Sequence, residues 1–130
     1  MKKLGIAAVF AAGAILLGAC TTQPIYNVND AMIGTPSGRH LSASQVRSAI
    51  VTAGTSLGWH VSDAGAGHLV GTLRLRTHTA VVDIPYNASR YSIVYKSSEN
   101  LEAANGQIHR NYNGWVQRLD NAIRTEISRM

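Results

Sequence analysis

Two stretches of the chain repeat apolar residues at the spacing of a helix. The apolar face of the first stretch consists of Val46, Ile50, Ala53 and Leu57. Ser42 and Gln45 form the pattern of a capping box, and Gly58 suits the left-handed residue that ends a helix. The pattern predicts a helix over 43–57, which Gly54 weakens by up to about 1 kcal/mol relative to alanine.

The second helical stretch is longer and runs to the C-terminal end. Its apolar residues are Ile108, Tyr112, Trp115, Val116, Leu119, Ile123, Ile127 and Met130. This spacing predicts a C-terminal helix. Asp120 and Arg124 stand four residues apart in it and are expected to pair, while Gly114 is a mild interruption.

Between the two helices, apolar and polar residues alternate as they do in half-buried strands. The pattern predicts a short strand at 59–61 and a last strand at 91–96. Between them the apolar set changes from odd positions (Leu69, Leu73, Leu75) to even positions (Ala80, Val82, Ile84). This change requires a turn or a bulge near residues 77–79. A turn, which we favour, makes two strands at 68–75 and 79–86, whereas a bulge makes one long bent strand.

The order of elements predicts an α+β fold. We expect a two-layer sandwich, an antiparallel sheet of three to four strands with an N-terminal and a C-terminal helix on one face. Residues 41–130 are long enough for one small core. Residues 20–40 contain prolines and glycines without a helical or strand period. We interpret 20–40 as a flexible tether about 25 Å long, in which residues 25–28 can dock locally.

The N-terminal apolar block has a different meaning. Lys2 and Lys3 precede fourteen uncharged residues at 4–17, which are apolar or glycine. A membrane-spanning helix needs about 20 apolar residues, whereas the core of a secretory signal peptide needs about 7–15. Residues 1–19 are therefore predicted to be a signal peptide that the mature protein lacks.

The end of this segment, Leu17-Gly18-Ala19-Cys20, resembles the lipobox of bacterial lipoproteins. The resemblance implies cleavage before Cys20 and acylation of its thiol, for example with palmitate. Two or more acyl chains hold a protein stably on a membrane. Thr21 stands where such lipoproteins carry an inner-membrane aspartate. This favours the outer membrane, facing the periplasm, if the cell is Gram-negative.

Removal of residues 1–19 changes the overall composition. The formal charge of +5 falls to +3, because Lys2 and Lys3 leave with the signal segment. The sole cysteine becomes a thioether, which excludes a disulfide framework, a cysteine zinc cage and thiol catalysis. The weak charge and the aromatic content of 6% argue against nucleic-acid binding.

The sequence contains no strong catalytic or metal-binding motif. The five histidines form no HxH, HExxH or HxxxH pattern, and no Gly-x-Ser-x-Gly elbow occurs. His68, His78 and Asp83 would meet at a metal only in one particular strand register. We therefore expect a protein without enzymatic activity, cofactor or metal. A small hydrolase or metalloenzyme is the less favoured alternative.

Basic residues suggest a binding surface on the sheet. Arg74, Arg76 and His78 share one strand parity, and Arg90 and Lys96 lie on or beside the last strand. If those strands are neighbours, a cationic stripe forms that would bind an anionic lipid or glycan. The alternative is an ordinary solvated sheet face.

The run at 108–116 is the most distinctive segment. Its polar residues His109, Arg110, Asn111 and Asn113 would form a recognition edge. Alternatively, Tyr112 and Trp115 anchor the helix, and the histidine and asparagine side chains bond loop backbone. This run and the strand at 91–95 look similar to small, uncharacterised proteobacterial lipoproteins, a resemblance that implies no particular activity. We expect a membrane-anchored envelope lipoprotein with a binding or scaffolding domain, whose partner is an envelope protein or an anionic lipid or glycan.

Overall fold

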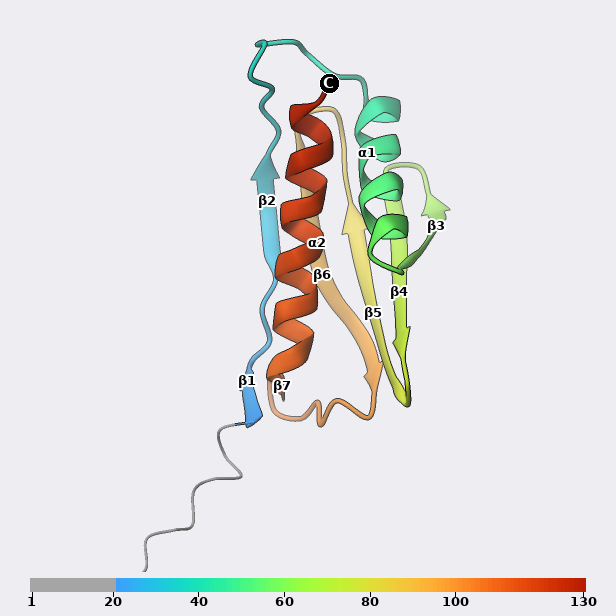
Figure 1. The fold of residues 1–130 in the computed structure, drawn as a ribbon, viewed down its shortest axis with the longest axis vertical. Coiled ribbons are helices and arrows are strands. Elements are labelled where there is room, and N and C mark those ends of the chain that lie inside the picture. The colour runs from blue at the N-terminus through green and yellow to red at the C-terminus, as the bar shows by residue number, and fades with distance from the viewer. Residues whose placement is uncertain (1–20) are drawn as a thin grey trace, which may run out of the picture.

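The computed structural model describes residues 21–130, so the predicted signal peptide and Cys20 lie outside the described residues. The elements in chain order are β1 (Thr22–Pro24), β2 (Val28–Met32), α1 (Ala43–Ser56), β3 (His60–Gly65), β4 (His68–Leu75), β5 (His78–Pro85), β6 (Arg90–Glu99), β7 (Gln107–His109) and α2 (Arg110–Ser128) (Figure 1). No helix among residues 21–130 is long and apolar enough to cross a membrane.

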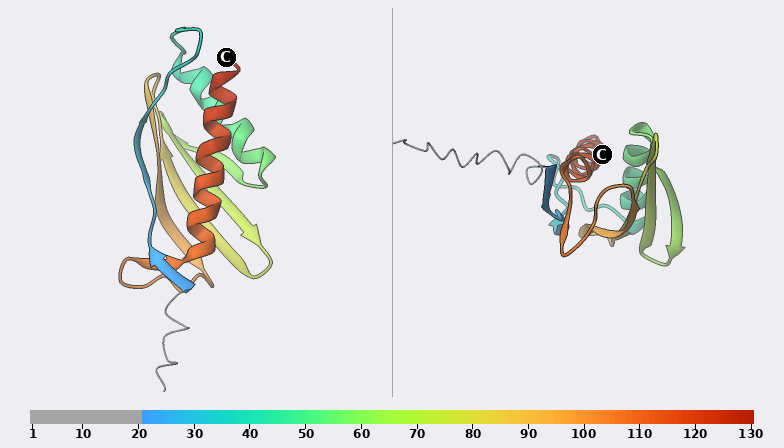
Figure 2. Two further views of the ribbon diagram at one scale, coloured as in Figure 1. Left: turned by 60° about the vertical axis from the view of Figure 1, so that its left-hand side comes forward. Right: turned by 90° about the horizontal axis from the view of Figure 1, so that it is seen from below.

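The chain forms one layer of strands and one layer of helices. Five strands lie in the order β2-β6-β5-β4-β3, and each neighbouring pair is antiparallel. Both helices cover the same face of this sheet (Figure 2). The short strands β1 and β7 pair separately. The predicted α+β class is confirmed, but the sheet has five strands where the sequence predicts three to four.

The additional strand comes from the segment expected to be a tether. β2 pairs with β6, and its Val28 and Ala31 are buried in the core. A register shift and the positive φ of Asp30, 49°, interrupt the strand. The interruption hides the period of two that would reveal β2 in the sequence. The prediction for 20–40 is corrected accordingly: residues 22–32 are folded onto the domain, and residues 33–42 join β2 to α1.

The change of apolar phase between β4 and β5 is a turn, as favoured. Leu75 pairs with His78, so only two residues connect the strands. Arg76 has a φ of 56°, the left-handed conformation that tight hairpins need. The bulge lies elsewhere, in β6, where Lys96 is skipped between the partners of Val81 and Val82.

The core fills the space between the helices and the sheet. The helices contribute Val46, Ile50 and Ala53 from α1 and Val116, Leu119 and Ile123 from α2. The predicted capping box is present, since Ser42 N–H donates to Gln45 Oε1 at 2.9 Å and Gln45 N–H donates to Ser42 Oγ at 3.1 Å. Leu57 follows the end of α1 and is 39% exposed, which corrects its predicted place on the apolar face.

Candidate functional site

The β4–β5 hairpin places the predicted basic residues on different sides of the sheet. Leu73 is buried under the helices, so Arg74 points from the opposite, uncovered face. The turn at Arg76 then reverses the chain, and His78 pairs with Leu75, which lies on the helix side. Because the turn breaks the period of two, residues 74, 76 and 78 do not share a face. The predicted cationic stripe is therefore wrong.

The uncovered face carries mixed charge rather than positive charge. Asp83 Oδ1 accepts a hydrogen bond from His68 Nε2 at 2.7 Å and lies 3.7 Å from Lys96 Nζ. Val70 and Val94, both half-buried, are the direct cross-strand neighbours of Asp83. A carboxylate among the basic groups offsets their charge, so this face does not favour an anionic ligand.

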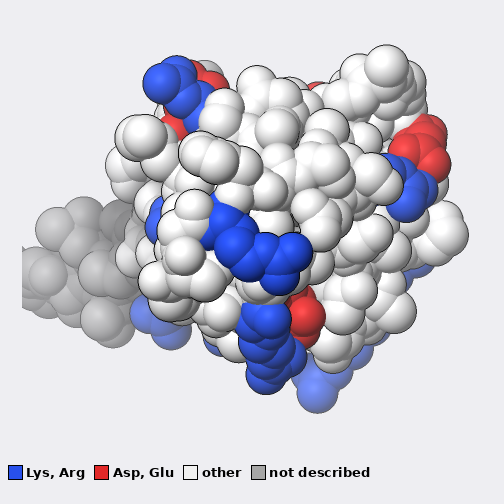
Figure 3. All heavy atoms as spheres, turned by 90° about the horizontal axis from the view of Figure 1, so that it is seen from above, with Lys and Arg blue, Asp and Glu red and all other residues white. Residues whose placement is uncertain are grey.

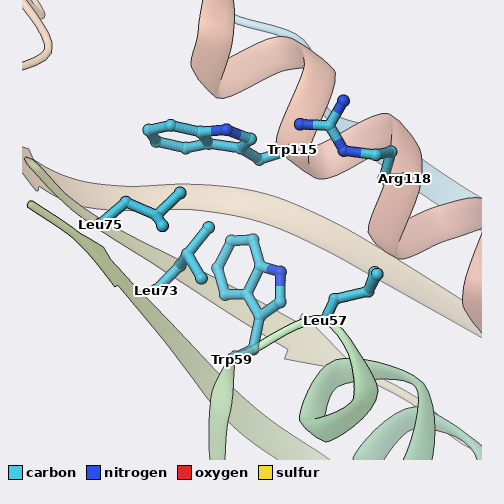
Figure 4. A pocket seen from close by; sticks show the side chains of 6 residues that line it. All are labelled: Leu57, Trp59, Leu73, Leu75, Trp115 and Arg118. Atoms are coloured by element: carbon cyan, nitrogen blue, oxygen red, sulfur yellow. The ribbon is translucent and has the colours of Figure 1, made fainter.

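On the helix side, the hairpin and the first half of α2 enclose two adjoining hollows. The larger hollow, about 310 Å³, is lined by Leu75, Arg76, His78, Asn111 and Trp115. The smaller, about 100 Å³, is lined by Leu57, Trp59, Leu73, Leu75, Trp115 and Arg118 (Figure 4). Leu75 and Trp115 line both hollows. We treat the two as one site and refer to it as the Trp115 groove.

The walls of the Trp115 groove are apolar and its rim is cationic. Figure 4 shows Trp115 above Leu75, with Trp59 pointing up toward α2 and Arg118 beside it on α2. Leu57 and Leu75, 39% and 43% exposed, are two of the four exposed large hydrophobic residues described. Exposed apolar residues gathered beside convergent polar groups are typical of binding sites.

Hydrogen bonds from the β6–β7 connection hold the hairpin side of the groove. His78 Nδ1 donates to the carbonyl oxygen of Asn100 at 2.7 Å. Asn100 Nδ2 in turn donates to the carbonyl oxygen of Thr77 at 2.8 Å. The ring of His78 stands 6.5 Å from the ring of Trp115, centroid to centroid, at a tilt of 52°. These contacts fix the position of the His78 ring against the wall that α2 provides.

Of the polar residues at the start of α2, one lines the groove and two stabilise the fold. His109 caps the helix, because its Nδ1 accepts the backbone N–H of Asn111 at 3.1 Å. Asn113 is buried and bonds the segment that connects β1 to β2. Arg110 and Asn111 are exposed, and only Asn111 lines the groove. The four residues therefore do not form one recognition edge: His109 caps α2, Asn113 holds the N-terminal segment, and only Arg110 and Asn111 are exposed.

Several arginines near the groove have no carboxylate within ion-pair distance among residues 21–130. They are Arg74, Arg76, Arg110 and Arg118. Other arginines pair with carboxylates, for example Arg47 with Asp63 and Arg124 with Asp120, whereas Arg39 and Arg90 have no such pair among residues 21–130. Unpaired guanidinium groups keep their donors free for a carboxylate or phosphate. Two of these unpaired guanidinium groups, those of Arg76 and Arg118, line the groove.

The opposite end of the molecule also carries basic side chains. Figure 3 shows this end from above, with basic side chains close together near the centre and lower edge beside one acidic group, and with further groups of basic and acidic atoms at the upper left and at the right. Arg129 pairs with Glu126, and Arg39 Nη1 donates to the carbonyl oxygen of Met130 at 3.0 Å. The hollow near the β5–β6 turn has a volume of about 140 Å³ and includes Asp30 and Arg90. Arg90 is the one basic residue that lines it, whereas Arg76 and Arg118 both line the groove.

Two buried tyrosines have strongly raised pKa values, but neither lines the Trp115 groove. Burial, and then a hydrogen bond to Asp120, raise the pKa of Tyr91. The hydroxyl of Tyr91 donates to Asp120 Oδ1 at 2.5 Å, and Arg124 Nε donates to the other carboxylate oxygen at 3.1 Å. Burial alone is the main cause of the raised pKa of Tyr112. Both groups belong to the core that supports the groove.

Sequence reasoning identified Arg76, His78 and Asn111 but did not bring them together. The apolar stripe of α2 predicts that Trp115 anchors the helix, and so it does not reveal that Trp115 lines the groove. Sequence reasoning also missed Arg118 and Leu75, which reach the groove from α2 and β4. The available signal was the position of Leu75, an apolar residue at the end of a predicted strand and beside a turn.

Among the described residues, no three histidine, cysteine, aspartate or glutamate side chains gather as a metal site would require. The chain matches no known family model, no curated protein and no solved structure.

Proposed function

We propose that this chain is a lipid-anchored lipoprotein of the bacterial envelope with a non-enzymatic binding domain. The resemblance of Leu17-Gly18-Ala19-Cys20 to a lipobox supports acylation of Cys20. Thr21 after the cysteine favours the outer membrane, with the domain in the periplasm, in a Gram-negative cell. The binding site of the domain is the Trp115 groove.

One observation carries the assignment of the site: Arg76, His78 and Asn111 converge on the apolar wall formed by Trp115 and Leu75. A flat or apolar group packs on an indole ring and buries area there. A phosphate or carboxylate beside it meets the free guanidinium groups of Arg76 and Arg118. The chemistry therefore selects a ligand with an anionic group next to an apolar or sugar face.

Labelling with palmitate tests the anchor. Cells that produce the wild-type chain should incorporate the label into a membrane-bound product, and the Cys20→Ala chain should not. A Thr21→Ala chain keeps the cysteine and serves as the control. Equal labelling of wild type and Cys20→Ala would remove the basis for the anchor.

Binding of a monomeric amphiphile tests the groove. Residues 20–130 with Cys20→Ser are titrated with dihexanoyl-phosphatidylglycerol, kept below the concentration at which it forms micelles, and tryptophan emission is recorded. The two tryptophans of the chain both line the groove, so binding should change their emission. Dihexanoyl-phosphatidylcholine should bind more weakly because its headgroup has no net charge.

The matched variants remove two arginines each. Arg76→Ala/Arg118→Ala should weaken binding of the anionic amphiphile roughly tenfold or more, because hydrogen bonds to charged groups are lost. Arg39→Ala/Arg129→Ala removes the same charge at the other end and should bind like wild type. Equal affinities for all three proteins would contradict the assignment of the groove.

A further inference from the structure

The chain enters the domain at the same end as the groove. Thr22 pairs with His109, which precedes α2, and the backbone N–H of His109 donates to the carbonyl oxygen of Leu101 at 2.8 Å. The neighbouring Asn100 bonds the β4–β5 hairpin at Thr77. Figures 1 and 2 show β1, β7, the hairpin tip and the start of α2 at one end, away from the C-terminus. We refer to this as the anchor end.

The contacts of β1 leave little chain between Cys20 and the anchor end. Two residues extend at most about 7 Å, so Thr22 lies within this distance of Cys20. A second clamp holds the following residues, since Asn113 Oδ1 accepts the backbone N–H of Tyr26 at 3.0 Å. If Cys20 is acylated as proposed above, the bilayer surface must therefore lie against the anchor end.

The anchor end has the surface chemistry of a protein that contacts anionic lipid. Arg74, Arg76 and Arg110 are exposed there without ion pairs among the described residues. Basic residues close to an anionic membrane are attracted to it, and the attraction fades over about 8 Å at physiological salt. The Trp115 groove, which Arg76 helps to line, lies at the same end, and tryptophan favours the interface of bilayer and water. Glu99 and Glu102, the nearby acidic residues, are fewer than these arginines.

We infer that the anchor end docks on the membrane that holds Cys20, with Arg76 and Arg110 on anionic phospholipid headgroups and the Trp115 groove at the interface. This inference rests on the proposed anchor and names the ligand source of the groove as that bilayer. α2 has 19 residues and is about 28 Å long. Because α2 begins at the anchor end, the C-terminal end projects away from the membrane, beyond the reach of its charge.

Fluorescence quenching of the acylated protein tests the docking. The protein is reconstituted into vesicles whose phospholipids carry bromine near the headgroup end of the acyl chains. One set contains phosphatidylglycerol and phosphatidylcholine, and the other contains phosphatidylcholine alone. Flotation confirms that the protein is anchored in both. We expect stronger quenching of tryptophan emission on the anionic vesicles, and loss of the difference near 1 M salt, where charges are screened within about 3 Å.

Variants of equal charge locate the docking surface. Arg76→Ala/Arg110→Ala should lower the ratio of docked to undocked domain about fivefold for each arginine, seen as reduced quenching on anionic vesicles. Arg39→Ala/Arg129→Ala, at the far end, should be quenched like wild type. A Trp115→Phe chain should lose most of the quenched emission, because Trp59 is only 3% exposed.

The possible failures are distinguishable. The docking inference is overturned, while the anchor stands, if the wild-type protein floats with the vesicles but its tryptophan emission is quenched on neither set. It is also overturned if both double variants lose the same amount of quenching. If acylated protein cannot be obtained because Cys20 takes no lipid, the proposed anchor fails, and this inference fails with it.

Discussion

The side chain of Asn113 in α2 accepts the backbone N–H of Tyr26 at 3.0 Å. The same side chain donates from Nδ2 to the carbonyl oxygen of Pro24 at 3.0 Å. One buried side-chain amide thus provides hydrogen-bond partners for the Pro24 carbonyl oxygen and the Tyr26 N–H, which lie on either side of Ile25. This contact fixes the N-terminal segment against α2 and thus the end at which the chain enters the domain.

Replacing Asn113 with alanine should destabilise the domain by about 1–3 kcal/mol, because a backbone donor and acceptor lose their partner. The amide of Tyr26 should exchange with solvent faster, while amides in the centre of the sheet change only through the lower global stability. Urea denaturation and hydrogen exchange measure the two effects. Asn111→Ala, on the exposed side of the same helix, should change stability by less than about 0.5 kcal/mol. Equal losses of stability in Asn113→Ala and Asn111→Ala would contradict a stabilising function of the Asn113 hydrogen bonds.

The hydroxyl of Tyr112 is buried without a hydrogen-bond partner among the described residues. Its ring packs edge-on against Tyr95, with 5.6 Å between the centroids. Removing an unsatisfied buried hydroxyl relieves a cost of about 1–3 kcal/mol and leaves the ring in place. Tyr112→Phe should therefore keep or raise the urea midpoint. A clear loss of stability would show that the hydroxyl has a partner.

Alkaline pH should weaken the fold. Tyrosine ionises near pH 10 in the unfolded chain, and burial raises the pKa of Tyr91 and Tyr112 in the folded protein above that value. The stability linked to their neutral form is fully present below pH 10 and is lost as the pH rises above it. The free energy of unfolding should fall by about 1.4 kcal/mol per pH unit for each tyrosine.

Urea titrations between pH 8 and 11.5 would measure this slope. Tyr112→Phe supplies the matched control, because one of the two tyrosines no longer titrates. Its slope above pH 10 should be about half that of wild type. A wild-type midpoint that stays constant across this range would contradict the prediction.

Two helical glycines should respond oppositely to alanine. A Cβ on Gly54 in α1 would meet Val61 Cγ2 at 2.6 Å, and overpacking of this kind costs about 1–3 kcal/mol. A Cβ on Gly114 in α2 would meet only Arg118 Nη1, at 3.9 Å. Gly114→Ala should therefore stabilise by up to about 1 kcal/mol through helix propensity. Thermal or urea unfolding measures the change in the free energy of unfolding for each variant. A change of the same sign in both would contradict the difference in packing at the two glycines.

Much of the fold was predictable where local patterns are regular. Both helices, the β4 and β5 strands and the turn between them follow from hydrophobic period and turn position. β2 was not predictable, because its bulge at Asp30 removes the alternation and it is held by distant partners. Asn27, for example, accepts the backbone N–H of Tyr95 at 2.9 Å. Such contacts link residues 68 positions apart and leave no local signal.

The candidate site was predictable only as a set of residue types. The charge and the alternate spacing of Arg76 and His78 mark them in the sequence. They reach the groove because the turn after Leu75 moves His78 to the face of the sheet that the helices cover. Trp115 follows the apolar period of α2, and only its half-buried position beside Leu75 distinguishes it from core residues.

The sequence by itself determined the α+β class and the helix positions, and it carries the lipobox resemblance on which the proposed anchor rests, since each depends on residues close together in the chain. Only the tertiary structure decided that the N-terminal segment is clamped by Asn113, and that unpaired arginines and the Trp115 groove share its end. The physical reason is that side-chain period and caps act within a few residues, whereas a groove and its charge are set by which distant segments pack together.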